Sequence, residues 1–300
     1  MASRDQMELE RPKAAQAAQH KPRAGVKTIL LHVQSDKSVD SRLETALSLA
    51  RSCDAHVTCL HVTPIEAYVA FDSFGGVFVM NEVIQSIEEE EKALRAKVEG
   101  ELRNEDVPWD YIGVTGNVPA QIISYAALAD LVVTGRVPRR GDFQGPAISL
   151  LGDLLHSART PLFIAADEGV PVDPMGTAII AWDGSYEAAN AVRGSIGLLE
   201  IASQVRVLQV KEEKDKAFPG TKLMKFLSRH EIHAELDEVA SAGDSSPQFI
   251  AGSIIAHAQK ANAAYVVAGG YNHSRIGEYV FGGVTRSLLA ACPVPLLMAH

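Results

Sequence analysis

Residues that could bind a phosphate group recur at defined spacings in the second half of the chain. Asp183 follows an apolar run, and Gly269, Gly282 and Gly283 border a loop that leads into a short amphipathic segment containing Thr285. Glycine lets a backbone approach a ligand closely, and the free amides at the start of a helix attract an anion. This spacing therefore predicts a binding site for an anionic ligand.

The elements that must position these residues are predicted by apolar runs that alternate with amphipathic segments. The run at 26–33 predicts a strand buried on both faces. Asp40 or Ser41 is expected to cap the helix that follows, and Glu44 would complete a capping box with Ser41. Further strands are expected at 55–64, 109–114, 130–135 and 160–165, and helices at 82–104, 119–129 and 149–158.

The second half of the chain repeats the first. The matching segments are TILLHVQSD (28–36) with TAIIAWDGS (177–185), HVTCLHVT (56–63) with QVRVLQVK (204–211), LVVTGR (131–136) with YVVAGG (265–270), and TPLFIA (160–165) with VPLLMA (294–299). Matches that keep their order along the chain indicate an internal duplication. Because each copy alternates strand and helix, we expect a doubly wound parallel sheet in each.

The same comparison predicts where the domains begin and end. Residues 1–24 are polar and lack the apolar core of a secretion signal, so we expect a disordered tail. The first domain is expected at 25–168 and the second at 176–300. A proline-containing linker at 169–175 would join them.

Topology predicts which of the candidate residues meet. In an open parallel sheet the ligand crevice lies beyond the carboxyl ends of the strands, where the winding reverses. For a five-stranded unit that starts in its middle, this point lies between the first and fourth strands. In the second domain the first strand ends at Asp183 and the fourth at Gly269, so both residues should face one crevice.

With these residues in view, the chain resembles a tandem universal stress protein over about residues 25–300. Nucleotide-binding members of that family carry an Asp after the first strand and a G-x2-G-x9-G-S/T loop after the fourth. Asp183 matches the acidic position, Gly269 the first glycine and Gly282 the third, while Asn272 stands at the second glycine and Gly283 at the Ser/Thr.

The resemblance also implies a ligand and roles for further residues. Val210 matches the position in the second strand whose backbone meets adenine, and Asp183 the residue on the ribose side. The implied ligand is ATP, with Mg²⁺, or a related adenine nucleotide. Asn tolerates positive φ, so Asn272 could preserve the turn. Neighbouring side chains that could replace the missing hydroxyl are those of His273, Arg275, Thr285 and Arg286.

The expected architecture follows from the resemblance as well. It implies two five-stranded, Rossmann-like domains of the nucleotide α-hydrolase type. In the family the last strands of two domains pair across a dimer. Here the two halves would make this contact within one chain, related by a pseudo-two-fold axis, and a homodimer of the whole chain is a further expectation.

The first half lacks the binding pattern. Gln34 stands opposite Asp183, and Ile148 and Ser149 stand opposite the glycine pair, although Gly135 matches Gly269. We therefore expect a degenerate domain kept for packing or regulation. A purely structural role is the alternative to ligand binding in the second half. Its glycines could be present only because tight turns need them, and Asp183 only because it caps a helix.

Composition narrows the choice of function classes. The chain has 300 residues, 47% of them hydrophobic and 22% charged, as in globular proteins. A net charge of −9 argues against nucleic acid as a partner, and no apolar run is long enough for a membrane span. The three cysteines form no CxxC pair, so neither a disulfide framework nor a metal site is expected.

Three functions remain open from the sequence. The first is a cytoplasmic stress-response protein that binds an adenine nucleotide as a regulatory ligand. The second is an enzyme, a weak ATPase or a nucleotidyl transferase, although no catalytic residue is expected because no general base is positioned. The third is a nucleotide-free interaction module, with the aromatic loop at 64–81 as its partner surface.

Overall fold

The computed structural model describes most of the chain and several of the expected segments. The described residues are 25–68, 70–71, 77–78, 81–136, 147–166, 172–211, 218–241, 243–270 and 282–300. The predicted tail, part of the linker, much of the aromatic loop and the site residue Asn272 lie outside them, as do His273 and Arg275.

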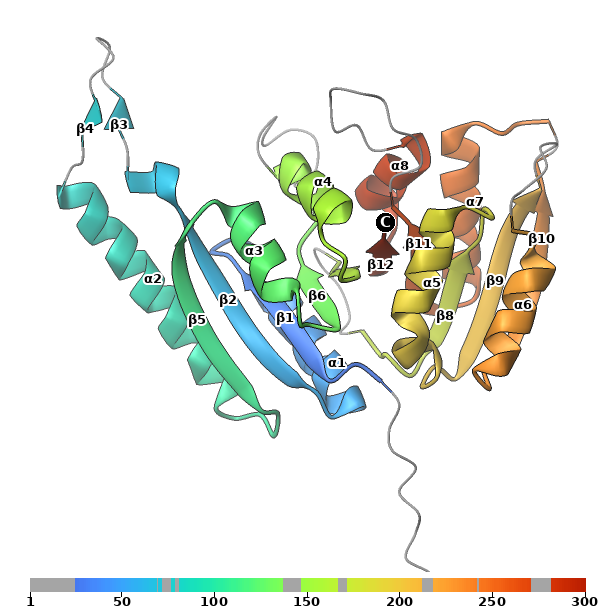
Figure 1. Cartoon of the computed structure of the whole chain (residues 1–300), viewed down its shortest axis with the longest axis horizontal. Helices are drawn as coiled ribbons and strands as arrows, with labels where there is room; N and C mark the ends of the chain where they lie inside the picture. Colours follow the sequence, from blue (N-terminus) through green and yellow to red (C-terminus); the bar gives the residue numbers. More distant parts are fainter. Residues whose placement is uncertain are drawn as a thin grey trace, which may run out of the picture.

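One ten-stranded sheet runs through the whole molecule (Figure 1). Its order is β10-β9-β8-β11-β12-β7-β6-β1-β2-β5. The strands of the first half are β1 (Thr28–Val33), β2 (His56–Pro64), β5 (Trp109–Gly116), β6 (Leu131–Thr134) and β7 (Leu162–Ile164). Those of the second half are β8 (Thr177–Ala181), β9 (Gln204–Lys211), β10 (Ala234–Ala240), β11 (Ala263–Gly269) and β12 (Leu296–Ala299). Each half therefore has the same order, with its first strand in the middle.

The halves join at their last strands. Within each half, all neighbouring strands of this ten-stranded sheet are parallel, whereas β12 and β7 are antiparallel, with Leu297 opposite Phe163. Both of these side chains are fully buried. Pairing thus covers two apolar strands that would otherwise be exposed edges prone to aggregation.

Helices cover both faces of the sheet and bury two apolar clusters. They are α1 (Val39–Cys53), α2 (Asn81–Leu102), α3 (Val118–Ala126), α4 (Ala147–Ser157), α5 (Tyr186–Leu199), α6 (Gly220–Arg229), α7 (Pro247–Lys260) and α8 (Gly283–Ala291). One cluster contains side chains of α1, α2, α5 and α6, and the other those of α3, α4, α7 and α8. In the second half, α5 and α6 lie over one face of the strands and α7 and α8 over the other (Figure 1).

The expected strands and helices are present, with one local error at the start of α1. Its N-cap is Ser38, so Asp40 and Ser41 lie inside the first turn. Ser41 Oγ donates to the carbonyl oxygen of Ala166, 2.7 Å away, and thus does not cap the helix. The predicted capping box is therefore wrong, because a tertiary partner takes the hydroxyl that local sequence assigned to the cap.

The connection after β2 contains a short helical turn and a small hairpin. The 3-10 turn spans Ile65–Tyr68, and β3 (Ala70–Phe71) pairs antiparallel with β4 (Val77–Phe78).

Among the described residues, no helix is both long and apolar enough to cross a membrane.

Candidate functional site

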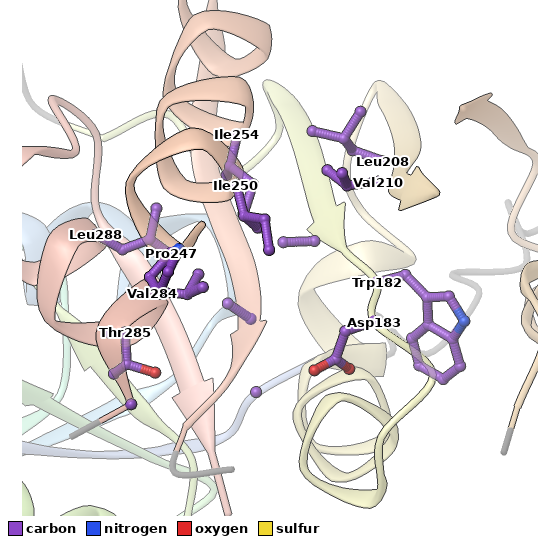
Figure 2. A pocket seen from close by; sticks show the side chains of 15 residues that line it. Trp182, Asp183, Leu208, Val210, Pro247, Ile250, Ile254, Val284, Thr285 and Leu288 are labelled. Atoms are coloured by element: carbon purple, nitrogen blue, oxygen red, sulfur yellow. The ribbon is translucent and has the colours of Figure 1, made fainter. Parts of the chain in front are cut away.

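A pocket of about 340 Å³ lies at the carboxyl ends of β8 and β11, where the winding of the second half reverses. Small-molecule sites in proteins typically measure about 300–1,000 Å³. Strands β8, β9 and β11 form its floor, and the first turns of α7 and α8 form its opposite wall (Figure 2). Because β8 pairs directly with β11, residues far apart in sequence meet here.

Asp183 lies at one end of this pocket with its carboxylate exposed. Its Oδ1 accepts a hydrogen bond from the backbone amide of Ser185, 2.9 Å away, across Gly184, whose φ of 75° requires glycine or a similarly tolerant residue. Ser185 is the N-cap of α5 and accepts from the amide of Ala188. Asp183 is therefore not the cap of α5, and its side chain borders the pocket.

The N-terminus of α8 lies across the pocket from Asp183 (Figure 2). Gly282 is its N-cap, and among the described residues no side chain caps this helix. The amides of Gly283, Val284 and Thr285 have no partner within the helix, because an α-helix leaves its first amides unpaired. The hydroxyl-bearing Thr285 is nearly buried, with 6% of its surface exposed. This end of the pocket can accept an anion.

The part of the pocket between β9 and α7 is apolar. Leu208 and Val210 come from β9, and Ile250 and Ile254 come from α7. In Figure 2 Ile250 and Ile254 lie on the α7 side, Leu208 and Val210 lie on the β9 side, and both pairs are away from the carboxylate of Asp183 and the hydroxyl of Thr285. A ligand that fits both ends would carry a flat or apolar group and an anionic group.

The glycines of the site have packing reasons of their own. A Cβ at Gly269 would lie 2.6 Å from the amide nitrogen of Ala188, so glycine lets β11 end against the backbone of α5. A Cβ at Gly283 would lie 2.6 Å from Cβ of Pro247, where α8 meets α7. Gly269 and Gly283 therefore have a packing reason, which differs from the tight turns considered from the sequence, and both also line the pocket.

The structure brings six of the seven predicted site residues into this pocket. They are Asp183, Val210, Gly269, Gly282, Gly283 and Thr285. Asn272 lies outside the described residues. The apolar wall formed by Pro247, Ile250 and Ile254 was not predicted, although the spacing of the two isoleucines on one helix face could have indicated it.

The corresponding crevice of the first half, at the carboxyl ends of β1 and β6, has different residues on its floor. His32 on β1 and Thr134 on β6 stand where the pocket has Ala181 and Ala268, and both are buried. Burial, together with the nearby Arg42 guanidinium and the neighbouring His61, lowers the pKa of His32 to about 3. The imidazole is therefore neutral at physiological pH.

Arg42 also belongs to this region of the first half. Its guanidinium is 3% exposed, pairs with Asp36 at 2.9 Å and donates to the carbonyl oxygen of Gln34 at 3.0 Å. It lies against Gly135, since a Cβ there would be 2.6 Å from Nη1. The residue that aligns with Gly269 therefore packs against a cation instead of a helix backbone.

The fold and the pocket define an α/β protein with a candidate ligand site at the switch point of a doubly wound sheet. The model of the Universal stress protein family matches residues 25–165. The chain also resembles a universal stress protein from Archaeoglobus fulgidus, at 17% identity and a TM-score of 0.70, covering 92% of this chain and 96% of that one. The family model thus places a domain similar to universal stress proteins in the first half of the chain, and the solved structure shows a shared fold over nearly the whole chain.

A second solved structure shares the fold over a similar length. It is a functionally unknown protein from Pseudomonas aeruginosa, at 15% identity and a TM-score of 0.57, with 91% of this chain and 92% of that one covered. At such identities the likeness shows the fold alone. No curated protein matches the chain.

Proposed function

We propose that the chain is a tandem universal stress protein whose C-terminal half binds an adenine nucleotide as a regulatory ligand in stress response. Each half would be one Rossmann-like domain, and a pseudo-two-fold axis would relate them through β7 and β12. The identical strand order of the two halves and the antiparallel β12–β7 pair support this arrangement. A cytoplasmic location is part of the same proposal.

The observation that carries the proposal is the division of the pocket into an apolar end and an anion-accepting end. The adenine ring would lie among Leu208, Val210 and Ile250, where an apolar flat group loses little by leaving water. The phosphates would lie at the N-terminus of α8, where amides and the helix dipole favour negative charge. Asp183 would accept hydrogen bonds from the ribose hydroxyls.

The ligand is ATP with Mg²⁺ in this proposal, and the metal would arrive with the phosphates. Among the described residues, no group of three or more His, Cys, Asp or Glu side chains is placed to hold a metal ion. Asp183 is the one titratable side chain in the described lining. Because no second described acid or base lines the pocket beside Asp183, the lining favours a bound signal over a substrate.

Calorimetric titration with magnesium-ATP tests the proposal, after mass analysis of small molecules released from the heat-denatured protein. We expect saturable binding, and Asp183→Ala should weaken it about tenfold, because a hydrogen bond to a charged group contributes about 1.5 kcal/mol or more. Thr285→Val should weaken it about threefold through the loss of one hydroxyl. Gln34→Ala changes the matching exposed position of the first half and should leave the affinity unchanged.

The outcomes separate the candidate functions. The proposal fails if millimolar magnesium-ATP produces no binding heat, which would leave a nucleotide-free interaction module. Equal weakening by Gln34→Ala and Asp183→Ala would move the site away from this pocket. Steady release of phosphate from the wild type, absent in Asp183→Ala, would make the protein an enzyme.

A further inference from the structure

A second cavity, of about 140 Å³, lies between α5 and α6. Helices α7 and α8 form the wall of the first pocket, so the two cavities lie on opposite faces of the sheet. Trp182 lines both, and Figure 2 shows its ring turned away from Val284 and Ile250. The other lining residues of the second cavity are not shared with the first.

Three of the eight residues that line this cavity are aromatic, and their rings contact neighbouring groups. Trp182 is 5% exposed, and its Nε1 donates to the carbonyl oxygen of Phe218 at 3.0 Å. The Phe218 ring also meets Tyr186 edge to face, with centroids 5.0 Å apart. Phe226 supplies the third ring, 4.6 Å from the ring of His230. Since the polar atom of Trp182 is satisfied, its ring can contact an apolar ligand.

Two cations stand at the rim of the same cavity. Arg193 on α5 and Lys222 on α6 both line it and both are exposed. Lys222 Nζ lies 5.9 Å from the centroid of Phe218, and Arg193 Nη1 lies 3.5 Å from the amide oxygen of Asn190. Among the described residues, no carboxylate forms a salt bridge with either cation. The chain as a whole has a net charge of −9, yet these two cations form no salt bridge with a described acid. The rim of the cavity therefore favours an anion.

We propose that the cavity between α5 and α6 is a binding site for a small aromatic carboxylate. The ring would enter the cavity among Trp182, Phe218 and Phe226, and the carboxylate would remain at the rim between Arg193 and Lys222. The proposal does not depend on nucleotide binding, because it uses none of the polar groups of the first pocket.

Size and chemistry select this ligand class. An apolar cavity of about 150 Å³ holds one benzene molecule, so 140 Å³ suits a single six-membered ring and excludes a purine nucleotide. Edge-to-face and offset contacts between aromatic rings stabilise beyond the area that they bury, so an aromatic ligand gains a contribution here that an aliphatic ligand lacks. The cations add a preference for negative charge that is modest at an exposed rim and screened by salt.

Fluorescence of Trp182 gives a direct test. The chain has two tryptophans, so Trp109→Phe leaves Trp182 as the reporter. Benzoate, benzamide and acetate would be titrated at low ionic strength. We expect a saturable change with benzoate, about fivefold weaker binding of neutral benzamide because only the charge differs, and no change with acetate, which lacks the ring.

Substitution of the rim cations provides the second arm. The double variant Arg193→Gln with Lys222→Gln should bind benzoate and benzamide equally. Lys225→Gln with Arg229→Gln removes the same charge from exposed positions of α6 outside the lining and should keep the preference. Both pairs lie on the surface, so the fold should survive.

A third arm fills the cavity. Ala189→Leu should extend into it and remove the response to both aromatic ligands, with thermal unfolding as the check on folding. The proposal is overturned if benzamide binds as tightly as benzoate, if the response does not saturate, or if the control pair of variants weakens benzoate as much as the rim pair. Those three results remain decisive even where Ala189→Leu does not fold.

Discussion

The crevices of the two halves occupy the same place in the same strand order and differ in what stands on their floors. In the second half Ala181 and Ala268 leave room for a pocket, whereas in the first half the corresponding residues are the buried His32 and Thr134. The comparison shows that a doubly wound sheet supplies the location of a site. Side-chain volume and charge at a few strand positions decide whether a ligand has space there.

The difference extends to the helix that follows the first strand. In the second half α5 approaches so closely that Gly269 contacts its backbone, and in the first half the Arg42 guanidinium lies against Gly135. Arg42 is neutralised by Asp36 and held by a carbonyl oxygen, so its charge is already compensated. An arginine in this state serves the packing of the first half.

Substitution of the aligned glycines Gly269 and Gly135 should produce the largest difference between the halves. Gly269→Ala places a methyl group 2.6 Å from a backbone nitrogen that cannot rotate away, so we expect a loss of about 3 kcal/mol in the free energy of unfolding. Gly135→Ala meets a side chain that can move, and about 1 kcal/mol is expected. Urea denaturation measures both, and equal losses would contradict the difference in packing.

Transfer of a first-half residue into the second half tests whether the floor decides binding. Ala181→His reproduces His32 in the pocket and should weaken the binding of magnesium-ATP by about thirtyfold, since an inserted ring overfills the space at a cost of about 2 kcal/mol. Calorimetry measures the affinity. Unchanged affinity in a folded Ala181→His protein would show that the floor does not control binding, and His32→Ala is the control that should leave it unaltered.

The buried histidine should make the first half sensitive to acid. Burial lowers the pKa of His32 from 6.5 to about 3, so below pH 6.5 the unfolded chain binds a proton that the folded chain does not. Stability therefore falls as the pH falls, by about 1.4 kcal/mol per unit, or about 2 kcal/mol between pH 6.5 and 5. Urea midpoints of wild type and His32→Gln should diverge over this window.

A matched variant keeps that measurement specific. His233 is an exposed histidine of the second half, and His233→Gln should retain the pH dependence of the wild type. If His32→Gln also retains it, the buried imidazole does not control acid stability.

The smallest expected difference concerns the helix caps that follow β1 and β8. Ser185 caps α5 through its hydroxyl, so Ser185→Ala should lower the free energy of unfolding by about 1 kcal/mol. Ser38 occupies the N-cap of α1 without a side-chain hydrogen bond, and Ser38→Ala should change it by less than about 0.5 kcal/mol. Thermal unfolding of the two variants, compared with wild type, measures the difference, and the reverse order would contradict the cap geometry.

Much of the fold could be predicted because buried parallel strands appear in the sequence as continuous apolar runs. The run that forms β1 and its repeat in β8 were both visible, and the pairing of β8 with β11 followed from strand order alone. The meeting of Asp183 with Gly269 was predicted for the same reason. The start of α1 was not, because Ser41 has a partner in Ala166, which lies far away in the sequence.

The apolar parts of both cavities could not be derived from the sequence. Ile250, Phe218 and Phe226 belong to separate elements, and each is an ordinary core or surface residue by its local pattern. Their convergence depends on how α6 and α7 pack on opposite faces of the sheet. Such packing follows from side-chain shapes across the whole core, which no short segment encodes.

The sequence by itself determined the alternation of strands and helices and the repetition of strand segments between the halves, because periodicity and residue order are local properties. Only the tertiary structure decided that Gly269 packs against α5, that His32 and Arg42 lie at the crevice of the first half, and that Trp182 separates two cavities. Those facts depend on distances between segments far apart in the chain. Close packing sets such distances, and it belongs to the folded molecule as a whole.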